Sequence, residues 1–318
     1  MRVLFWGTPE FAAPPLRALL GEGFDVVGVV TQPDRPQGRS RSALVASPIK
    51  QIALEESLPV LQPERPRGPE FIEQIRALEP DISVVVAYGH ILPKEVIDLP
   101  RLGTLNIHAS LLPSWRGAAP IQAAIRSGDA ETGVTIMRMV PRLDAGPILL
   151  QVPTPIVHDE TYGELQLRLS ELGALALIEA LSLIDIGQMV EQPQDDAVAT
   201  IARKIEREHA RIDWSLPAAE VARAIRAFDP KPGAFSTLAD AEVKLFGART
   251  ATLDHTPAAE HTTPGSVVAI DDSGAFIACG DGLVRITDAQ PAGRRRQTMS
   301  ELARGRGIRV GDRLGPTG

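Results

Sequence analysis

The chain has 318 residues, of which 44% are hydrophobic and 23% charged, and it carries a formal net charge of −7. This composition excludes a disordered chain and a uniformly basic coat for nucleic acid. The single cysteine, Cys279, excludes an intrachain disulfide and a thiolate-based metal cluster, and no apolar run approaches the roughly 20 residues of a membrane span. We therefore expect a cytoplasmic protein without a membrane segment, and the length predicts two domains.

The first part of the chain alternates short apolar runs with helix-like segments. The apolar or β-branched runs are residues 2–6, 25–31, 81–87 and 103–108. The helix-like segments between them are residues 14–20, 47–56, 69–78 and 118–127. Two later strands, 132–139 and 146–156, precede a long periodic helix from Thr161 to about Gly187. This order predicts an α/β fold with an open, doubly wound, mostly parallel sheet.

The composition changes after the long helix. Residues 191–199 carry Gln, Pro and Asp without periodicity, so we expect a first domain over residues 1–188, a linker over 189–205 and a second domain over 206–318. In the second domain, a helix near 218–228 precedes four short runs, which are residues 242–250, 265–270, 274–279 and 283–289. Short strands at this spacing predict a small antiparallel β-barrel, for which the oligonucleotide-binding (OB) type is one solution.

Ligands of an open parallel sheet bind at the carboxyl ends of its strands. The first such turn, residues 7–11, reads GTPEF and lacks the G-x-G-x-x-G pattern that brings backbone close to a pyrophosphate. The motifs G-x-x-x-x-G-K-[ST] and G-x-S-x-G do not occur either. The sequence therefore argues against a dinucleotide site, a phosphate-cradling loop and a serine nucleophile of the hydrolase type.

Two polar residues end the strand at 103–108. Asn106 and His108 occupy alternate positions, so their side chains are expected on one face of the strand. An amide and an imidazole side by side can donate hydrogen bonds to an oxygen that gains negative charge, and a histidine can also move a proton near neutral pH. The alternative is that both residues only tie the strand end to the next loop.

A carboxylate follows in the turn at residues 139–147, which reads MVPRLDAGP. Asp144 within this turn could orient His108 and accept a proton from an attacking amine. An Asp before Ala-Gly-Pro is also a common turn former, and the sequence alone does not place it beside His108.

Several strings together resemble one family, the folate-dependent formyltransferases. In the first domain they are GTPEFA at 7–12, TQPDRP at 31–36, VAYG at 86–89, NIHASLLP at 106–113, WRGAAPIQ at 115–122 and DAETGVTIM at 129–137. In the second domain they are ARIDWS at 210–215, IRAF at 225–228, GDG at 280–282 and QPAG at 290–293. The resemblance covers nearly the whole chain and is greatest to those members that act on methionine attached to initiator tRNA.

The resemblance implies transfer of a formyl group from 10-formyltetrahydrofolate to the α-amino group of methionyl initiator tRNA, by a monomer that needs no metal. It implies that Asn106, His108 and Asp144 form the catalytic trio. It also implies that the folate is contacted by two sets of residues, Ser110, Leu111, Leu112 and Pro113 in one loop and Tyr88, Gly89, Ile91 and Leu92 around the pterin.

Two basic segments are candidates for tRNA contact, because a chain of negative net charge must bind a polyanion through local positive groups. The first contains Arg35, Arg39 and Arg41, and the resemblance implies that this loop enters the acceptor end of the tRNA. The second is Arg294, Arg295 and Arg296 on the expected barrel. Either segment could instead be an ordinary solvated surface.

Two other functions compete with this one. A formyltransferase or formyltetrahydrofolate hydrolase acting on a small molecule, such as a glycinamide ribonucleotide or an amino-sugar nucleotide enzyme, would share the Asn-His-Asp site. A non-catalytic RNA-binding module would explain the barrel and the basic segments but would not need the trio. The second domain and its ARIDWS string favour the tRNA-directed enzyme.

Overall fold

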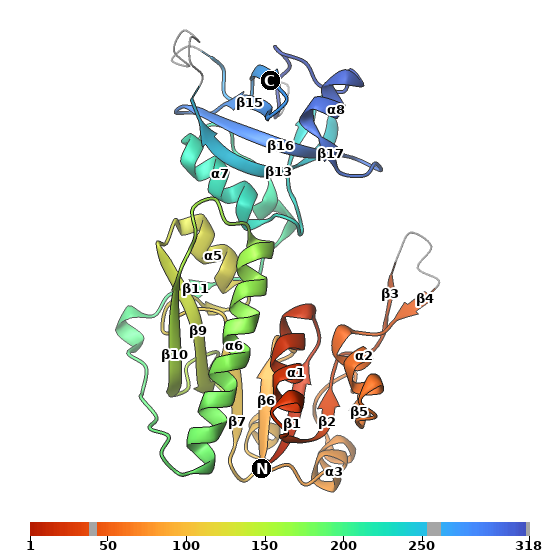
Figure 1. The fold of residues 1–318 in the computed structure, drawn as a ribbon, viewed down its shortest axis with the longest axis vertical. Helices are drawn as coiled ribbons and strands as arrows, with labels where there is room; N and C mark the ends of the chain where they lie inside the picture. Colours follow the sequence, from red (N-terminus) through yellow and green to blue (C-terminus); the bar gives the residue numbers. More distant parts are fainter. Residues whose placement is uncertain (38–42, 253–261, 316–318) are drawn as a thin grey trace. The chain divides into compact units, whose positions relative to one another are not determined.

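The computed structural model describes residues 1–37, 43–252 and 262–315, and the chain forms two compact units (Figure 1). The first unit comprises Met1–Pro120, Thr132–Thr154 and Gln166–Ala202, and the second comprises Ile121–Glu131, Pro155–Leu165 and Arg203–Gly318. The domain limits at 188 and 206, with the linker between them, stay predictions.

A seven-stranded sheet in the order β10-β9-β7-β6-β1-β2-β5 forms the centre of the first unit. Its strands are β1 (Arg2–Gly7), β2 (Asp25–Val30), β5 (Val60–Leu61), β6 (Ile82–Val86), β7 (Thr104–His108), β9 (Glu131–Arg138) and β10 (Ile148–Pro155). Neighbours from β5 to β7 pair in parallel, whereas β9 pairs antiparallel with β7. The chain runs outward from β1 to β5 and returns to β6 on the other side of β1, so the topological switch point lies beside β1.

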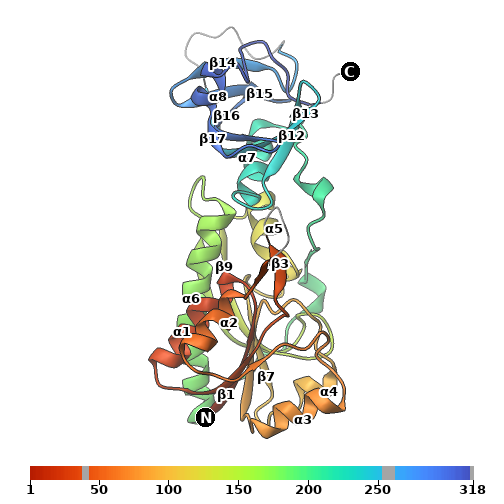
Figure 2. The same cartoon turned by 90° about the vertical axis from the view of Figure 1, so that its right-hand side faces the viewer.

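Helices cover both faces of this sheet (Figure 2). They are α1 (Ala13–Gly21), α2 (Pro48–Glu55), α3 (Pro69–Ala77), α4 (Lys94–Ile97) and α6 (Tyr162–Asp185). Figure 2 shows α1, α2 and α6 on one side of the sheet and α3 and α4 on the other. On the latter side, Trp6, Phe71 and Tyr88 pack in one buried cluster. On the former, the Ser170 hydroxyl donates to the Phe11 carbonyl at 2.7 Å and fastens α6 to the start of the chain.

Two small strand pairs accompany the main sheet. One joins β3 (Arg35–Gln37) to β4 (Ala43–Val45), and the other joins β8 (Arg116–Gly117) to β11 (Ile201–Ala202) in parallel. Two or three residues are too few to show a periodic pattern, so the sequence did not predict these strands. The second pair brings together segments that lie about 85 residues apart in the chain.

The second unit contains an antiparallel sheet in the order β12-β13-β16-β15-β14, with β17 paired to β16. Its strands are β12 (Ala234–Leu238), β13 (Ala241–Ala251), β14 (Val267–Asp271), β15 (Gly274–Ala278), β16 (Leu283–Pro291) and β17 (Gln297–Thr298). Bridges from Arg313 to Ser266 and from Leu314 to Leu238 connect its two edges. The helices α5 (Pro120–Ser127) and α7 (Ala218–Ala227) precede this sheet in the chain, and α8 (Met299–Arg304) follows it.

The predicted fold class is confirmed. The strand expected at 103–108 is β7, and the periodic helix expected from Thr161 is α6. The helix expected near residues 218–228 is α7, and its buried residues Val221, Ala222 and Ile225 lie at helical spacing on one face. Among the described residues, no helix combines the length and the apolar character needed to cross a bilayer.

Candidate active site

The strand β7 carries the first two candidate residues. Asn106 and His108 alternate with the core residues Leu105 and Ile107, which are 0% and 3% exposed. The His108 ring is itself buried, with its Nε2 atom 2.9 Å from the Trp115 carbonyl oxygen. Strand alternation thus places Asn106 and His108 on one face, at the carboxyl end of the strand.

Asp144 lies close to His108, although 36 residues separate them in the chain. Its Oδ2 atom is 3.8 Å from Nδ1 of His108. The two ring nitrogens of His108 thus have oxygen atoms as neighbours, the Trp115 carbonyl at 2.9 Å and the Asp144 carboxylate at 3.8 Å. The structure brings the predicted His-Asp pair together, on the strand face shared by Asn106.

The turn that carries Asp144 connects β9 to β10 and is shaped by two unusual residues. Asp144 has a φ of 44°, in the left-handed region that Asp tolerates better than most residues. Gly146 lies so close to the end of β9 that a Cβ there would be 1.8 Å from the Arg138 carbonyl oxygen. The backbone N–H of Gly117 donates to Oδ2 of Asp144 at 2.8 Å, so the carboxylate is held from a third segment.

The loop after β7 contains the four residues expected to contact folate. Ser110 and Leu112 are buried, and the Thr135 hydroxyl joins them by donating to the Ser110 carbonyl at 2.7 Å and accepting from the Leu112 N–H at 3.1 Å. The Ser110 hydroxyl donates to the Ser114 carbonyl at 2.6 Å. Leu111 and Pro113, in the same loop, are partly exposed.

The four residues expected around the pterin lie in the segment that follows β6, the strand next to β7 in the sheet. The Tyr88 ring is 1% exposed and packs edge-on against Trp6 at 5.3 Å, and Leu92 is also buried. Gly89 is exposed, and Ile91 is 83% exposed. A ligand at this edge would therefore meet Gly89 and Ile91, whereas the Tyr88 ring belongs to the core.

Chemically, the site combines an amide, an imidazole and a carboxylate at the carboxyl edge of an open sheet. The amide and the imidazole can donate to a developing oxyanion, and the carboxylate can accept a proton. Among the described residues, no group of three or more His, Cys, Asp and Glu side chains has an arrangement that could hold a metal ion. Sequence reasoning missed the contributions of Trp115 and Gly117, because a main-chain acceptor or donor has no residue-type signature.

The residues expected to contact tRNA fall into different environments. Arg35 is exposed and donates to the Gln32 side chain, while Arg39 and Arg41 lie outside the described residues. Arg294 and Arg295 are exposed on the turn between β16 and β17. These predicted contacts stay predictions.

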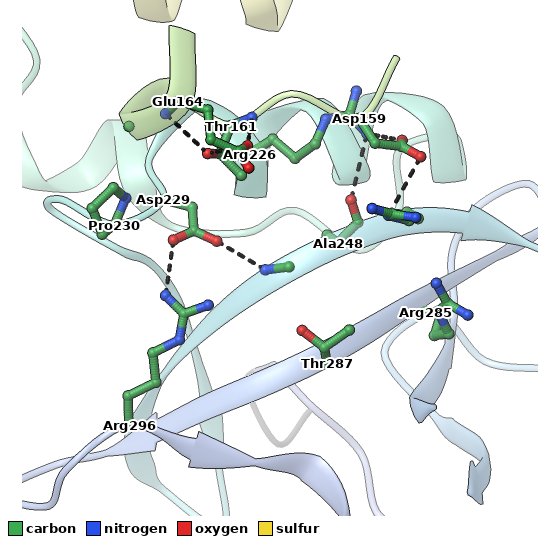
Figure 3. Close-up of a pocket in the computed structure, with 13 residues that line it drawn as sticks. Asp159, Thr161, Glu164, Arg226, Asp229, Pro230, Ala248, Arg285, Thr287 and Arg296 are labelled. Carbon is green, nitrogen blue, oxygen red and sulfur yellow. Dashed lines mark hydrogen bonds and ion pairs between the residues drawn. The ribbon is translucent and has the colours of Figure 1, made fainter. Parts of the chain in front are cut away.

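Arg296 is held within the second unit, where it lines a cavity of about 730 Å³ (Figure 3). Its guanidinium binds the carboxylates of Asp229 at 3.0 Å and Asp288 at 3.3 Å and lies over the Phe246 ring. On the opposite wall, Arg226 forms an ion pair of 2.8 Å with Asp159, and burial lowers the pKa of Arg226 while Asp159 opposes that shift.

The same cavity is lined by Arg285, whose Nε atom is buried and has no hydrogen-bond partner in the described part of the chain. Arg249 also lines it, 3.5 Å from Asp159. The cavity thus presents four arginines, partly balanced by carboxylates, in a unit otherwise built on an antiparallel sheet.

Two family models match most of the chain. Residues 1–181 match the formyl transferase family, and residues 204–307 match the formyl transferase C-terminal domain. The chain belongs to the formyl transferase family.

Individual relatives narrow the comparison. A methionyl-tRNA formyltransferase of Marinobacter nauticus is 46% identical over 305 residues, covering 96% of each chain. One of Pseudomonas paraeruginosa is 48% identical over 302 residues, covering 95% of each chain. Among solved structures, HypX from Aquifex aeolicus in complex with tetrahydrofolic acid superposes with a TM-score of 0.65 at 22% identity, over 95% of this chain and 46% of HypX. At this identity, the likeness to HypX shows a shared fold only.

Proposed function

We propose that the protein transfers the formyl group of 10-formyltetrahydrofolate to the α-amino group of methionine attached to initiator tRNA. The observation that carries the proposal is the convergence of His108 and Asp144, 3.8 Å apart, on the strand face that also bears Asn106. The two methionyl-tRNA formyltransferases that align with nearly the whole chain support the choice of acceptor.

In the proposed reaction, the methionyl amine attacks the formyl carbon and a new C–N bond forms. The Asn106 amide donates a hydrogen bond to the formyl oxygen as it becomes an oxyanion, and His108 does so once this oxygen replaces the Trp115 carbonyl as the partner of its Nε2 atom. Asp144 accepts the proton that the new ammonium loses, directly or through a water molecule. His108 gives a proton to the N10 nitrogen of the folate as the old C–N bond breaks, and Asp144 returns its proton to His108.

The folate would lie against the loop at residues 110–113 and the segment that follows β6. Ile91 and Leu143 support this placement, because these large apolar side chains are 83% and 56% exposed on segments next to the trio. Exposed apolar groups at a sheet edge fit the flat face of a fused ring. The hydrogen bonds from Thr135 hold the loop in shape without using its outer surface.

The tRNA backbone would be contacted by Arg35, Arg39 and Arg41 on one segment and by Arg294 and Arg295 on the other. Arg296 would act there mainly by shaping the turn, because its guanidinium already binds two carboxylates. We expect the enzyme to work as a monomer in the cytoplasm.

A small-molecule acceptor is the second candidate. The two methionyl-tRNA formyltransferases that align with nearly the whole chain at 46% and 48% identity count against it. Purified protein would be incubated with 10-formyltetrahydrofolate and with methionylated initiator or elongator tRNA, and formylmethionine would be counted. Formylation of the initiator species supports the proposal, whereas formylation of free amino sugars or glycinamide ribonucleotide alone would replace it.

A further inference from the structure

Gln194 makes two hydrogen bonds to the turn that carries Asp144. It lies between α6 and β11, in a stretch whose neighbouring side chains are exposed, but its own side chain is partly buried. Its Nε2 atom donates to the carbonyl oxygens of Asp144 at 2.9 Å and Gly146 at 2.7 Å. One primary amide thus uses both of its N–H groups on the main chain of this turn.

The other end of the amide is fixed by Arg116. The Oε1 atom of Gln194 accepts from Nε of Arg116 at 3.0 Å and from Nη2 at 2.7 Å. Arg116 is 6% exposed, and its Nη1 atom donates to Asp196 at 2.9 Å. Donors surround the oxygen and acceptors surround the nitrogen, so the amide has a single satisfactory orientation.

The same network reaches the carboxylate of Asp144. Arg116 precedes Gly117, whose N–H donates to Oδ2 of Asp144, the atom nearest to His108. The segment 116–118 is in turn held by β11 and the residue before it, through bonds from Arg116 N to Thr200 O and from Ala118 N to Ala202 O, both 2.9 Å. The main chain and the side chain of Asp144 are therefore fixed from one connected set of residues.

We propose that Gln194 is a positioning residue that holds the Asp144 carboxylate in place against His108, so that the segment between α6 and β11 supports catalysis through Asp144. This inference rests on the proposed function only for its kinetic consequence. Without Gln194, the turn would lose the two donors that fix the carbonyls of Asp144 and Gly146. A misplacement of a catalytic group by about 1 Å can cost roughly 100-fold in rate.

Three variants test the proposal kinetically. Gln194→Ala removes both donors, and Gln194→Glu keeps the shape and the acceptor for Arg116 but places oxygen against two carbonyls. Gln192→Ala is the matched control, because the Gln192 side chain is exposed while its backbone still pairs with Ile148. We expect kcat to fall about 10- to 100-fold in both Gln194 variants, with KM for each substrate little changed. Gln194→Ala should also lower the thermal midpoint, because it leaves two N–H groups of the buried Arg116 without their acceptor. A normal kcat in both variants overturns the proposal.

A double-mutant cycle shows whether Gln194 acts through Asp144. In an Asp144→Asn background, Gln194→Ala should reduce the single-turnover rate no further, since residues that act as a unit are non-additive. An equal additional loss would mean that Gln194 acts elsewhere, and the positioning role would be wrong.

A spectroscopic measurement separates this inference from the proposed function. In the NMR spectrum of protein labelled with ¹⁵N-histidine, the His108 ring signals are identified as those missing from the His108→Gln variant. Both Gln194 variants should move those signals toward their position in Asp144→Asn, and Gln192→Ala should leave them in place. Unmoved signals overturn the inference even if the enzyme formylates tRNA, and moved signals support it even if methionyl-tRNA proves to be the wrong acceptor.

Discussion

The backbone N–H of Gly117 donates to Oδ2 of Asp144 across 2.8 Å, and this is the oxygen that faces His108. Gly117 has a φ of 117°, which side chains of L-residues strongly disfavour. A Cβ at this position would lie 2.5 Å from the Ala202 carbonyl oxygen, because β8 and β11 are paired there. The glycine therefore permits both the strand pairing and the donor that fixes the carboxylate.

Gly117→Ala is expected to lose activity and stability together. The strained φ and the contact with Ala202 would destabilise the fold by about 2–4 kcal/mol and move the N–H away from Asp144. Gly21→Ala is the matched control, because Gly21 ends α1 with open space around its Cβ position and no unusual φ. Thermal unfolding and formylation would be measured on both, and a Gly117→Ala protein with the parent's melting point would contradict the explanation.

Asn106→Ala and His108→Ala are expected to lose turnover while remaining folded. Loss of one donor to an oxyanion typically costs about 10² to 10³ in rate, roughly 2.7 to 4 kcal/mol. The buried neighbours Leu105 and Ile107 keep β7 in the sheet, so far-UV circular dichroism should not change. Near-normal formylation by either variant would remove these side chains from the mechanism.

Long elements of this fold are predictable from the sequence, and short ones are not. The helix α6 spans 24 residues and shows its apolar periodicity over several turns. The strands β5 and β11 span only 2 residues each, which is too short for a pattern to emerge. Pairing across long separations, such as β8 with β11, depends on tertiary packing that no local signal records.

The candidate site shows the same division. Asn106 and His108 are predictable because strand alternation fixes which residues share a face. The approach of Asp144 depends on Gly117 and Gln194, which follow from neither periodicity nor composition. The composition of residues 191–199 predicts a simple connector, yet Gln194 within them binds the turn that carries Asp144. A tyrosine can stack on the ring of a ligand, but the Tyr88 ring instead packs against Trp6 in the core.

Tyr88→Phe is expected to flatten the loss of stability at alkaline pH. Burial raises the pKa of Tyr88 from 10.0 to about 12, so the folded state holds this proton more tightly than the unfolded state. The resulting stability is complete below pH 10 and is lost as the pH rises through about 12, by up to roughly 2–3 kcal/mol.

Urea unfolding of parent and Tyr88→Phe proteins between pH 8 and pH 12, roughly the range of the shift, would check this. At neutral pH the variant should lie within about 1 kcal/mol of the parent, because the Tyr88 hydroxyl is buried without a partner in the described part of the chain. The raised pKa of the Cys279 thiol is common to both proteins and cancels in the difference. Identical slopes for the two proteins would contradict the prediction.

Replacing Arg294 and Arg295 with Gln is expected to weaken tRNA binding and flatten its salt dependence. Each lost phosphate contact should lower the slope of log K against log salt by about one, since fewer counterions are released on binding. Arg296 is left in place, because its bonds to Asp229 and Asp288 make it part of the fold. Filter binding of initiator tRNA at several salt concentrations measures the slope, and folate affinity should not change. The double variant Arg65→Gln and Arg67→Gln removes the same charge from an exposed stretch before α3, so a slope that falls equally in both proteins would assign the effect to net charge.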